Sequence, residues 1–503
     1  MAVSGASELG RCEKPPKFGN RDPLTSHAPP QGRPPSVKTG LRSFWKFSYI
    51  SGHAAAALTT LETSWQGKKS IMHRRGFIKK GLQVGSQYLG VAALASSTDA
   101  GAQILAAAGG STGGDSESEV FWARVRDQFP LTREIIYVNN GGLGPSPRVS
   151  IQAIHDRIDE LEETSETGHS AKLWSSVKEK AGRVLGCRPE EIAYTRNTTE
   201  GVNIVCNGLP LKTGDEVITS THEHVGNTIS WLARQKRDGI RIRVFEPSTA
   251  SAQENIDRIE SLINPRTRVI SISHVTTATG QVLPVGEIGE LAAQHDLWYF
   301  IDGAQSAGMM PVDVTGMGCH AYATSGHKWL LGPKGTGLLY VRESALESIE
   351  ARFVGAYSNA GHTDMATGEF GFHPTAQRYE YGTVNIPLFL GLGESIGFLL
   401  DLGLETVKRR NHALAAALMT GLDELGAQVL SPRNTGEHSS IVTFKIKEMP
   451  KDELQQFLSK HYRIRSRGIY EGGLEALRIS LHIYNSFDEV SQILEGVRAA
   501  QAA

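Results

Sequence analysis

Residues 298–329 read WYFIDGAQSAGMMPVDVTGMGCHAYATSGHKW, and two apolar runs in this stretch decide the fold class. Trp298–Asp302 ends in a carboxylate, and Ala321–Thr324 leads to Lys328. Short apolar runs that end in polar residues and alternate with helical segments are typical of buried parallel strands. Ligands bind beyond the carboxyl ends of such strands, so Asp302 and Lys328 are expected to face one site.

The same alternation extends in both directions from this stretch. The other predicted strands are Glu191–Tyr194, Glu216–Ser220, Ile240–Phe245, Arg268–His274 and Gly337–Val341. Amphipathic periodicity predicts the helices Ile151–Leu161, Leu173–Leu185, Asn227–Arg237 and Ile288–Gln294. This pattern predicts an α/β fold over residues 120–386, with a mostly parallel sheet and helices on both faces. The pattern leaves open whether the first residues of this range belong to the large domain or to the smaller one.

A smaller C-terminal α+β domain is predicted over residues 387–503. Its predicted elements are helices Leu388–Leu402 and Gly403–Leu425, strand Ser440–Ile446, helix Asp452–His461 and strand Ala476–Tyr484. Ser486 and Glu489 have the spacing of a capping box that opens a last helix. In the strand from Ala476, alternation places Arg478 on a polar face, which is either a carboxylate clamp or a solvated outer face.

Composition limits the function classes. The chain has 503 residues, with 40% hydrophobic and 21% charged residues and a formal charge of -1. No basic excess is present to neutralise a phosphate backbone, so a nucleic-acid partner is not expected. The cysteines are Cys12, Cys187, Cys206 and Cys319, without a CxxC pair. They predict neither a disulfide framework nor a zinc site.

The first hundred residues have a different character. Residues 1–71 lack sustained periodicity, which indicates a disordered leader or translation from a start codon upstream of the real one. The segment Met72–Lys79 contains Arg74-Arg75 followed by an aromatic and a basic residue, and it is similar to a twin-arginine export signal. With a small-x-small cleavage site at Ala100–Ala102, residues 72–102 are predicted to be a signal peptide. A basic clump before a surface helix is the other interpretation.

The predicted signal implies the twin-arginine export machinery as a partner and a periplasmic or exported location. The location is cytoplasmic if the signal is not used.

The strand ends together favour pyridoxal phosphate (PLP) as cofactor. A lysine with apolar and aromatic neighbours is nucleophilic toward an aldehyde, so Lys328 is suited to form a Schiff base. A carboxylate such as Asp302 keeps a pyridine nitrogen protonated, and PLP needs both groups. Thr198-Thr199 opens a helix and can cradle a phosphate, and His224 can lie on the ring. Asp302 has three other interpretations: a metal ligand, a general base or a cap. The other interpretation of His222 with His224 is a zinc site.

Seven segments in order resemble the class V aminotransferase family of fold-type I PLP-dependent enzymes. The resemblance covers about Tyr137 to Val497. The segments are Tyr137–Gly142, Thr198–Glu200, Glu223-His224, Asp302–Gln305, Ser325–Lys328, Tyr381–Thr383, and Arg478–Ser480 with Tyr484-Asn485.

The resemblance implies a role for each matching residue. It implies that Lys328 holds PLP, Asp302 pairs with the pyridine nitrogen and His224 stacks on the ring, and these three are the predicted catalytic residues. Gln305 would bond the ring hydroxyl. The phosphate would be held by Thr198, Thr199, Ser325 and His327. Thr383 would reach the phosphate of a second subunit, which implies a homodimer with active sites at its interface. The amino acid substrate would be bound by Arg478, through its carboxylate, and Asn140.

The reaction at the α-carbon stays open among several candidates. Cysteine desulfurases of this family carry a catalytic Cys on a loop before the carboxylate-binding Arg, but residues 464–477 contain none. The segment His274–Gly280 departs from the desulfurases, which carry Asn near Thr277, and it resembles the isopenicillin N epimerase branch. The first expectation is therefore an epimerase or a related α-proton-abstracting enzyme. A C–S lyase on cysteine derivatives and an aminotransferase are alternatives, and an exported PLP-fold binding protein is the non-enzymatic one.

Overall fold

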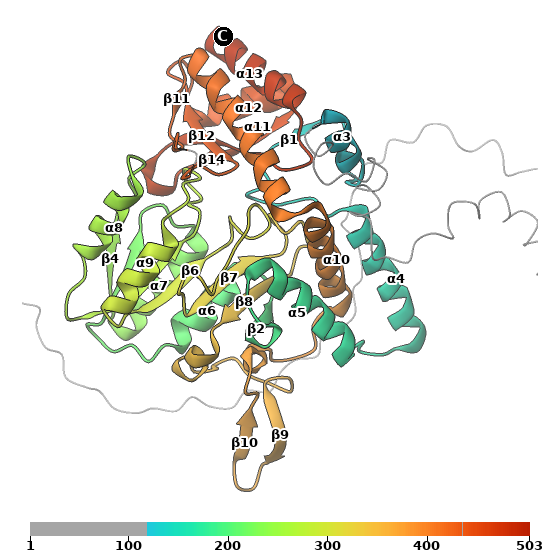
Figure 1. The fold of residues 1–503 in the computed structure, drawn as a ribbon, viewed down its shortest axis with the longest axis vertical. Coiled ribbons are helices and arrows are strands. Elements are labelled where there is room, and N and C mark those ends of the chain that lie inside the picture. Colours follow the sequence, from blue (N-terminus) through green and yellow to red (C-terminus); the bar gives the residue numbers. More distant parts are fainter. Residues whose placement is uncertain (1–117, 435) are drawn as a thin grey trace, which may run out of the picture. The chain divides into compact units, whose positions relative to one another are not determined.

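The computed structural model describes residues 118–434 and 436–503, which belong to one compact unit (Figure 1). The predicted leader over residues 1–71 and the predicted signal peptide over residues 72–102 lie outside the described residues.

In the described part of the chain, seven strands form the main sheet: β2 (Ile192–Thr195), β3 (Glu216–Ser220), β4 (Arg241–Phe245), β5 (Thr267–Ser273), β6 (Trp298–Asp302), β7 (Ala321–Ser325) and β8 (Gly337–Val341). Their order is β2-β8-β7-β6-β5-β3-β4. β8 pairs antiparallel with β2 and β7, and the remaining pairs are parallel. The prediction of a mostly parallel α/β sheet is confirmed.

Helices cover both faces of this sheet because its strands are apolar on both sides. Tyr299 and Ile301 belong to one hydrophobic core, whereas Phe300 between them belongs to another, as the alternation along a strand requires. The first core includes residues of α5 (Ala171–Leu185), α9 (Val285–Gln294) and α10 (Ile386–Leu402). The second includes residues of α6 (Thr198–Gly208) and α7 (Val225–Asp238). The predicted helices on both faces are therefore confirmed.

The C-terminal part contains a smaller antiparallel sheet. Within the described residues it has the strand order β11-β12-β15-β14. Its strands are β11 (Gln428–Val429), β12 (Ile441–Lys445), β14 (Arg467–Ile469) and β15 (Ala476–Ser480), and its helices are α11 (Leu404–Glu424), α12 (Lys451–Tyr462) and α13 (Phe487–Gln501). Ser486 caps α13 with the predicted capping box. The predicted α+β character of this part is confirmed.

The predicted end of the strand Ala476–Tyr484 is wrong, and one of the two interpretations of its polar face is excluded. The strand ends at Ser480, because Asn485 N–H donates to His482 O and closes a turn. The polar face is not solvated, since the side chains of Arg478 and His482 are fully buried.

The N-terminal segment of the described chain joins the C-terminal part. β1 (Ile136–Tyr137) pairs in parallel with β13 (Ile464–Arg465), and Asn139 forms a bridge with Ser480. Further elements not predicted from the sequence are α3 (Glu119–Asp127), α8 (Ala252–Glu260) and the hairpin β9 (Asn359–Asp364) with β10 (Glu369–Phe372). The hairpin is largely exposed, β9 has no apolar alternation, and the alternation of Phe370 and Phe372 in β10 is too short to predict a strand from the sequence. α4 (Arg148–Thr164) packs against α10.

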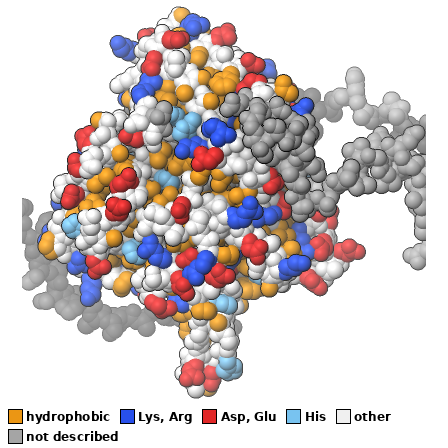
Figure 2. Space-filling view, viewed as in Figure 1, with side chains coloured by type: hydrophobic (Ala, Val, Ile, Leu, Met, Phe, Trp, Pro, Cys, Tyr) orange, Lys and Arg blue, Asp and Glu red, His pale blue; other side chains and the backbone are white. Residues whose placement is uncertain are grey.

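Lys and Arg side chains are interspersed with Asp and Glu on the face seen in Figure 2. Among the described helices, none alone is long and apolar enough to cross a bilayer; α10 and α11 pass that test only as a pair bent by 81°.

Gly144 is a point of close approach between the N-terminal segment and the loop that carries Lys328. Its N–H donates to His327 O at 2.6 Å, and a Cβ at this position would lie 2.2 Å from Lys328 O. We expect Gly144→Ala to destabilise the protein by about 2 kcal/mol, because a backbone oxygen cannot move aside as a side chain can. Urea unfolding of the purified protein measures this loss.

Gly286→Ala is the matched control, since a Cβ at Gly286 would meet nothing within 4 Å and the residue lies in α9. Its expected effect is between zero and a stabilisation of about 1 kcal/mol. Equal urea midpoints for the two variants would show that the close approach at Gly144 does not constrain the loop.

Candidate active site

Lys328 lies in the loop after β7, at the carboxyl edge of the main sheet. Its side chain is buried, and burial lowers the pKa of its amine to about 8. The negative charge of Asp302 opposes this shift, whereas the positive charges of Arg478 and Arg467 add to it. A larger fraction of this amine than of an ordinary lysine is therefore neutral, and nucleophilic, near neutral pH.

Asp302 is the last residue of β6, beside β7 in the sheet. Its Oδ1 accepts a hydrogen bond from Ala304 N at 2.9 Å. Burial raises the pKa of this carboxyl to about 6, and the charge of Glu223 contributes to the rise. A buried carboxylate with one backbone donor favours a cationic or N–H partner, which is what a protonated pyridine nitrogen supplies.

His224 caps the N-terminus of α7. Its Nδ1 accepts from Gly226 N at 3.1 Å, so the ring carries its proton on Nε2. Burial, together with the charge of Lys328, lowers the pKa of His224 to about 4. The ring is therefore neutral at physiological pH and can lie flat on an aromatic ligand without adding a charge.

Glu223 holds the turn before His224, a structural role that the sequence motif did not reveal. Its carboxylate accepts from Ser220 Oγ and Ser273 Oγ, both at 2.6 Å, and from Asn227 Nδ2 at 3.0 Å. These bonds link β3, β5 and α7. The network fixes the direction in which the His224 ring can point.

The predicted phosphate-binding residues gather at the N-terminus of α6. Thr198 N donates to Ser325 Oγ at 3.0 Å, and the two hydroxyls are 2.7 Å apart. His327 Nδ1 is buried and has no hydrogen-bond partner within the described part of the chain. A Cβ at Gly226 would lie 2.5 Å from Thr199 Oγ1, so this glycine keeps Thr199 accessible. A helix N-terminus with hydroxyl donors suits a phosphate group.

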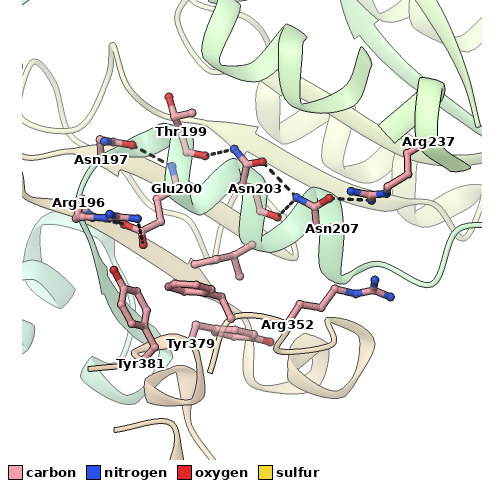
Figure 3. Close-up of a pocket in the computed structure, with 12 residues that line it drawn as sticks. Arg196, Asn197, Thr199, Glu200, Asn203, Asn207, Arg237, Arg352, Tyr379 and Tyr381 are labelled. Atoms are coloured by element: carbon pink, nitrogen blue, oxygen red, sulfur yellow. Dashed lines mark hydrogen bonds and ion pairs between the residues drawn. The ribbon is translucent and has the colours of Figure 1, made fainter. Parts of the chain in front are cut away.

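A surface cavity of about 840 Å³ extends from Thr199 along the outer side of α6 (Figure 3). Asn203 Nδ2 donates to Thr199 O, and Asn207 Nδ2 donates to Asn203 O, so amide side chains line one wall. Tyr379 and Tyr381 line the opposite wall (Figure 3). Its remaining lining residues are Arg196, Asn197, Glu200, Ile204, Arg237, Arg352 and Phe353.

Thr383 follows this wall in the sequence and is exposed. Its predicted contact is with a second subunit, and this contact and the homodimer stay predictions.

Gln305 is held by three hydrogen bonds beside the cluster. Its Oε1 accepts from Trp329 Nε1 at 2.7 Å, and its Nε2 donates to Gly141 O at 3.0 Å and to Thr277 Oγ1 at 3.3 Å. The amide thus joins the N-terminal segment, the loop after β5 and the residue next to Lys328.

Arg478 is a fully buried cation on β15. Its Nη1 donates to Thr277 O at 3.0 Å and to Thr277 Oγ1 at 2.9 Å, and its Nη2 donates to Asn139 Oδ1 at 3.3 Å. Its Nε has no partner within the described residues. Burial lowers the pKa of Arg478 to about 9, and the charge of Arg467 adds to the shift. A buried guanidinium without a carboxylate on its unpaired donor is suited to bind the carboxylate of an amino acid.

Asn140 completes the substrate side of the cluster. Its Oδ1 accepts from Tyr484 OH at 3.1 Å, whereas its Nδ2 is buried without a partner in the described structure. Ser480 Oγ is likewise unpartnered, and a Cβ at Gly141 would lie 3.0 Å from it. Buried polar atoms without partners favour a bound group that satisfies them. Together with Lys328, Asp302 and His327, this donor set fits PLP and an amino acid carboxylate.

The sequence did not assign a role to the pair Arg467 and Glu471. Arg467 Nη2 donates to Glu471 Oε1 at 2.6 Å, and the Glu471 side chain is buried. Both charges act on the pKa values of Lys328, His224 and Arg478. In the sequence, the feature that could have identified this pair is its position on the Cys-free loop before Arg478.

Comparisons with known proteins agree with this geometry. Residues 158–493 match the model of the family described as aminotransferase class-V. A probable cysteine desulfurase of Pyrococcus abyssi is 27% identical over 387 residues, covering 74% of this chain and 95% of the relative. The isopenicillin N epimerase of Streptomyces clavuligerus is 28% identical over 393 residues, covering 75% of this chain and 98% of the relative.

Solved structures of the cystine C–S lyase C-DES are also similar. One holds the reaction product cysteine persulfide, with a TM-score of 0.68, 28% identity and coverage of 74% of this chain and 99% of that chain. Another, a variant, holds glycine linked to the PLP cofactor, with the same TM-score and identity and coverage of 74% and 98%.

The family match spans well over half of the chain, and the strand-end cluster has the donor set that its cofactor requires. The protein is therefore a PLP-dependent enzyme of the aminotransferase class-V family.

Proposed function

We propose that this enzyme is a lyase that breaks the C–S bond of a cysteine-derived amino acid without using a thiol of its own. An S-substituted cysteine and water would give pyruvate, ammonia and a thiol. The C–S electron pair leaves with sulfur, and the proton lost from the α-carbon balances the thiolate. This proposal differs from the epimerase that the sequence first favours.

The positions of the cysteines carry this proposal. Among the described residues the cysteines are Cys187, Cys206 and Cys319, none of which contacts the cluster around Lys328. Burial raises the pKa of each of these thiols to about 12, so they are poor nucleophiles. The loop before Arg478 contains no Cys, and a salt bridge between Arg467 and Glu471 is found there instead. Among the described residues, a route through a protein-bound persulfide therefore has no thiol near the site.

The comparisons supply further support. Several relatives are named as cysteine desulfurases, and the solved lyase C-DES is named for cleavage of cystine. Chemistry at a C–S bond is thus frequent among similar proteins. The Cys-free loop favours the lyase among these reactions.

Each residue of the site would have a distinct role in this reaction. Lys328 would hold the cofactor aldehyde, Asp302 its ring nitrogen, and Thr198 with Ser325 its phosphate. The bound cofactor supplies an electron sink for the pair left on the α-carbon. Lys328, whose pKa is about 8, is the base that accepts the α-proton, and Arg478 orients the substrate through its carboxylate.

A second candidate is epimerisation at the α-carbon. Two relatives are named as isopenicillin N epimerases, at 28% identity. Thr277 belongs to the segment that resembles the epimerase branch, and its hydroxyl accepts a hydrogen bond from Arg478. An epimerase needs a proton donor on the face opposite its base.

The products distinguish these reactions. The PLP-loaded enzyme is incubated in deuterated water with cystine, S-substituted cysteines and other amino acids. We expect pyruvate and ammonia in equal amounts from the cysteine derivatives, with an equal amount of thiol from S-substituted cysteines and of cysteine persulfide from cystine, and loss of all these products with Lys328→Ala. Deuterium at the α-carbon with the amine retained would establish epimerisation instead. A keto acid with pyridoxamine phosphate would establish transamination, and binding without turnover would leave a binding protein.

The lowered pKa of Lys328 predicts how cofactor loading depends on pH. Because only the neutral amine attacks an aldehyde, the rate at which the apoprotein gains visible absorbance with PLP should rise about tenfold per pH unit and level off near pH 8. Stopped-flow absorbance measures this rate. The Lys328→Arg variant provides the background from other lysines. A rate that still rises above pH 10 would indicate an ordinary lysine pKa of 10.5.

We also propose export by the twin-arginine route, which rests on the segment Met72–Lys79. Arg74→Lys combined with Arg75→Lys should keep the protein in the cytoplasm, since this signal requires the arginine pair. Cell fractionation followed by immunoblotting measures the exported fraction. Lys68→Arg with Lys69→Arg is the matched control and should leave export unchanged. If both variants are exported to the same extent, the proposed twin-arginine route is wrong.

A further inference from the structure

A second cavity adjoins the substrate clamp, on the side of β13 and the end of α12. Its volume is about 940 Å³. The residues that line it are Ile135, Asn139, Gln455, Gln456, Ser459, Lys460, Arg463, Ile464, Arg465, Ser466 and Arg467. The charged members of this lining are Lys460, Arg463, Arg465 and Arg467, and all four are cations.

Three of these cations form no ion pair with the described residues. Lys460, Arg463 and Arg465 are exposed, and no carboxylate of the described residues lies within ion-pair distance of them. Arg467 differs, because it forms a salt bridge with Glu471. Cations held in a concave surface without an acidic residue raise the local concentration of anions.

Ser466 gives an independent indication of a ligand. This residue lines the cavity and is 6% exposed, and its Oγ is buried without a hydrogen-bond partner within the described chain. The neighbouring backbone is already satisfied, because Gln455 Nε2 donates to Ser466 O and Gln455 Oε1 accepts from Gly468 N. The hydroxyl therefore remains as a buried, unused donor in the wall of the cavity.

Two residues connect this cavity to the clamp. Asn139 lines the cavity and accepts a hydrogen bond from Arg478 Nη2. Arg467 lines it too, and it lies directly opposite Arg478 in the register of β14 and β15. Residues opposite each other in an antiparallel pair point to the same face of the sheet. A small molecule whose α-carboxylate binds Arg478 can thus extend its side chain into the basic cavity.

We propose that this cavity binds a second negative group of the substrate, so that the preferred substrate is a cysteine whose sulfur substituent carries a carboxylate or a similar anion. The inference rests on the proposed function for the α-carboxylate at Arg478 and the sulfur at the β-carbon. It names the substrate class that the proposed lyase would prefer.

S-carboxymethylcysteine and S-carbamoylmethylcysteine test the inference, since they have nearly the same shape and differ by one charge. Rapid mixing with the PLP-loaded full-length enzyme gives each dissociation constant from the early change in cofactor absorbance, before turnover. We expect the carboxylate compound to bind about tenfold more tightly, because contacts with two or three partly exposed cations add up to about that factor. The difference should shrink when salt is raised to about 0.5 M.

The double variant Lys460→Gln with Arg465→Gln should reduce this preference to less than about twofold, since these side chains supply two of the unpaired charges. Lys447→Gln is the matched control: Lys447 is exposed on the same part of the chain, outside the cavity, and its loss should keep the preference. Both exchanges remove exposed cations, so thermal unfolding should be nearly unchanged.

Binding of the carboxylate compound no tighter than that of the amide, including no binding of either, overturns the inference. A preference that persists in the double variant also overturns it. The proposed lyase is judged separately from product formation. If the enzyme prefers the carboxylate compound in binding but releases no pyruvate, the cavity assignment stands and the lyase proposal fails.

Discussion

The burial of charged groups at the carboxyl edge of the main sheet is the constraint on which the rest of the structure depends. Lys328, Asp302 and Arg478 are all removed from water. Burial moves their pKa values toward the neutral forms, to about 8, 6 and 9. An uncompensated buried charge costs several kcal/mol, so this edge favours a ligand that carries the complementary groups. PLP with an amino acid supplies a ring N–H, an aldehyde and a carboxylate.

The surrounding elements keep these charges in place through hydrogen bonds. Glu223 ties two strands of the main sheet to α7, and Gln305 ties the N-terminal segment to Trp329, next to Lys328. Gly144 allows the N-terminal segment to pass within contact of the Lys328 backbone. A rigid frame of this kind fixes the reacting groups before a ligand arrives, and such positioning is a large part of the catalytic effect of an enzyme.

Just outside this frame, several charged side chains are exposed and unpaired. Arg467 is paired with Glu471, but the cations beyond it in the basic cavity are left unpaired. Exposed cations cost little to leave unpaired, because water solvates them. An unpaired cluster beside a buried clamp therefore costs little stability, and it can contribute to substrate preference through the distal end of a substrate.

Sequence alone determined the seven strands of the main sheet, the class of the fold and the chemical types at the strand ends. These follow from local periodicity, as the adjacent pair β6 and β7 with Asp302 and Lys328 illustrates. Local patterns missed the exposed hairpin β9–β10 and overextended the strand after Ala476, because a turn closed by Asn485 ends that strand.

Only the tertiary structure decided that Arg478 is buried and what it contacts. Asn139, 339 positions earlier in the chain, accepts from Arg478, and Arg467 lies opposite it in the sheet. Alternation along a strand shows which residues share a face, but what covers that face depends on the packing of segments distant in sequence.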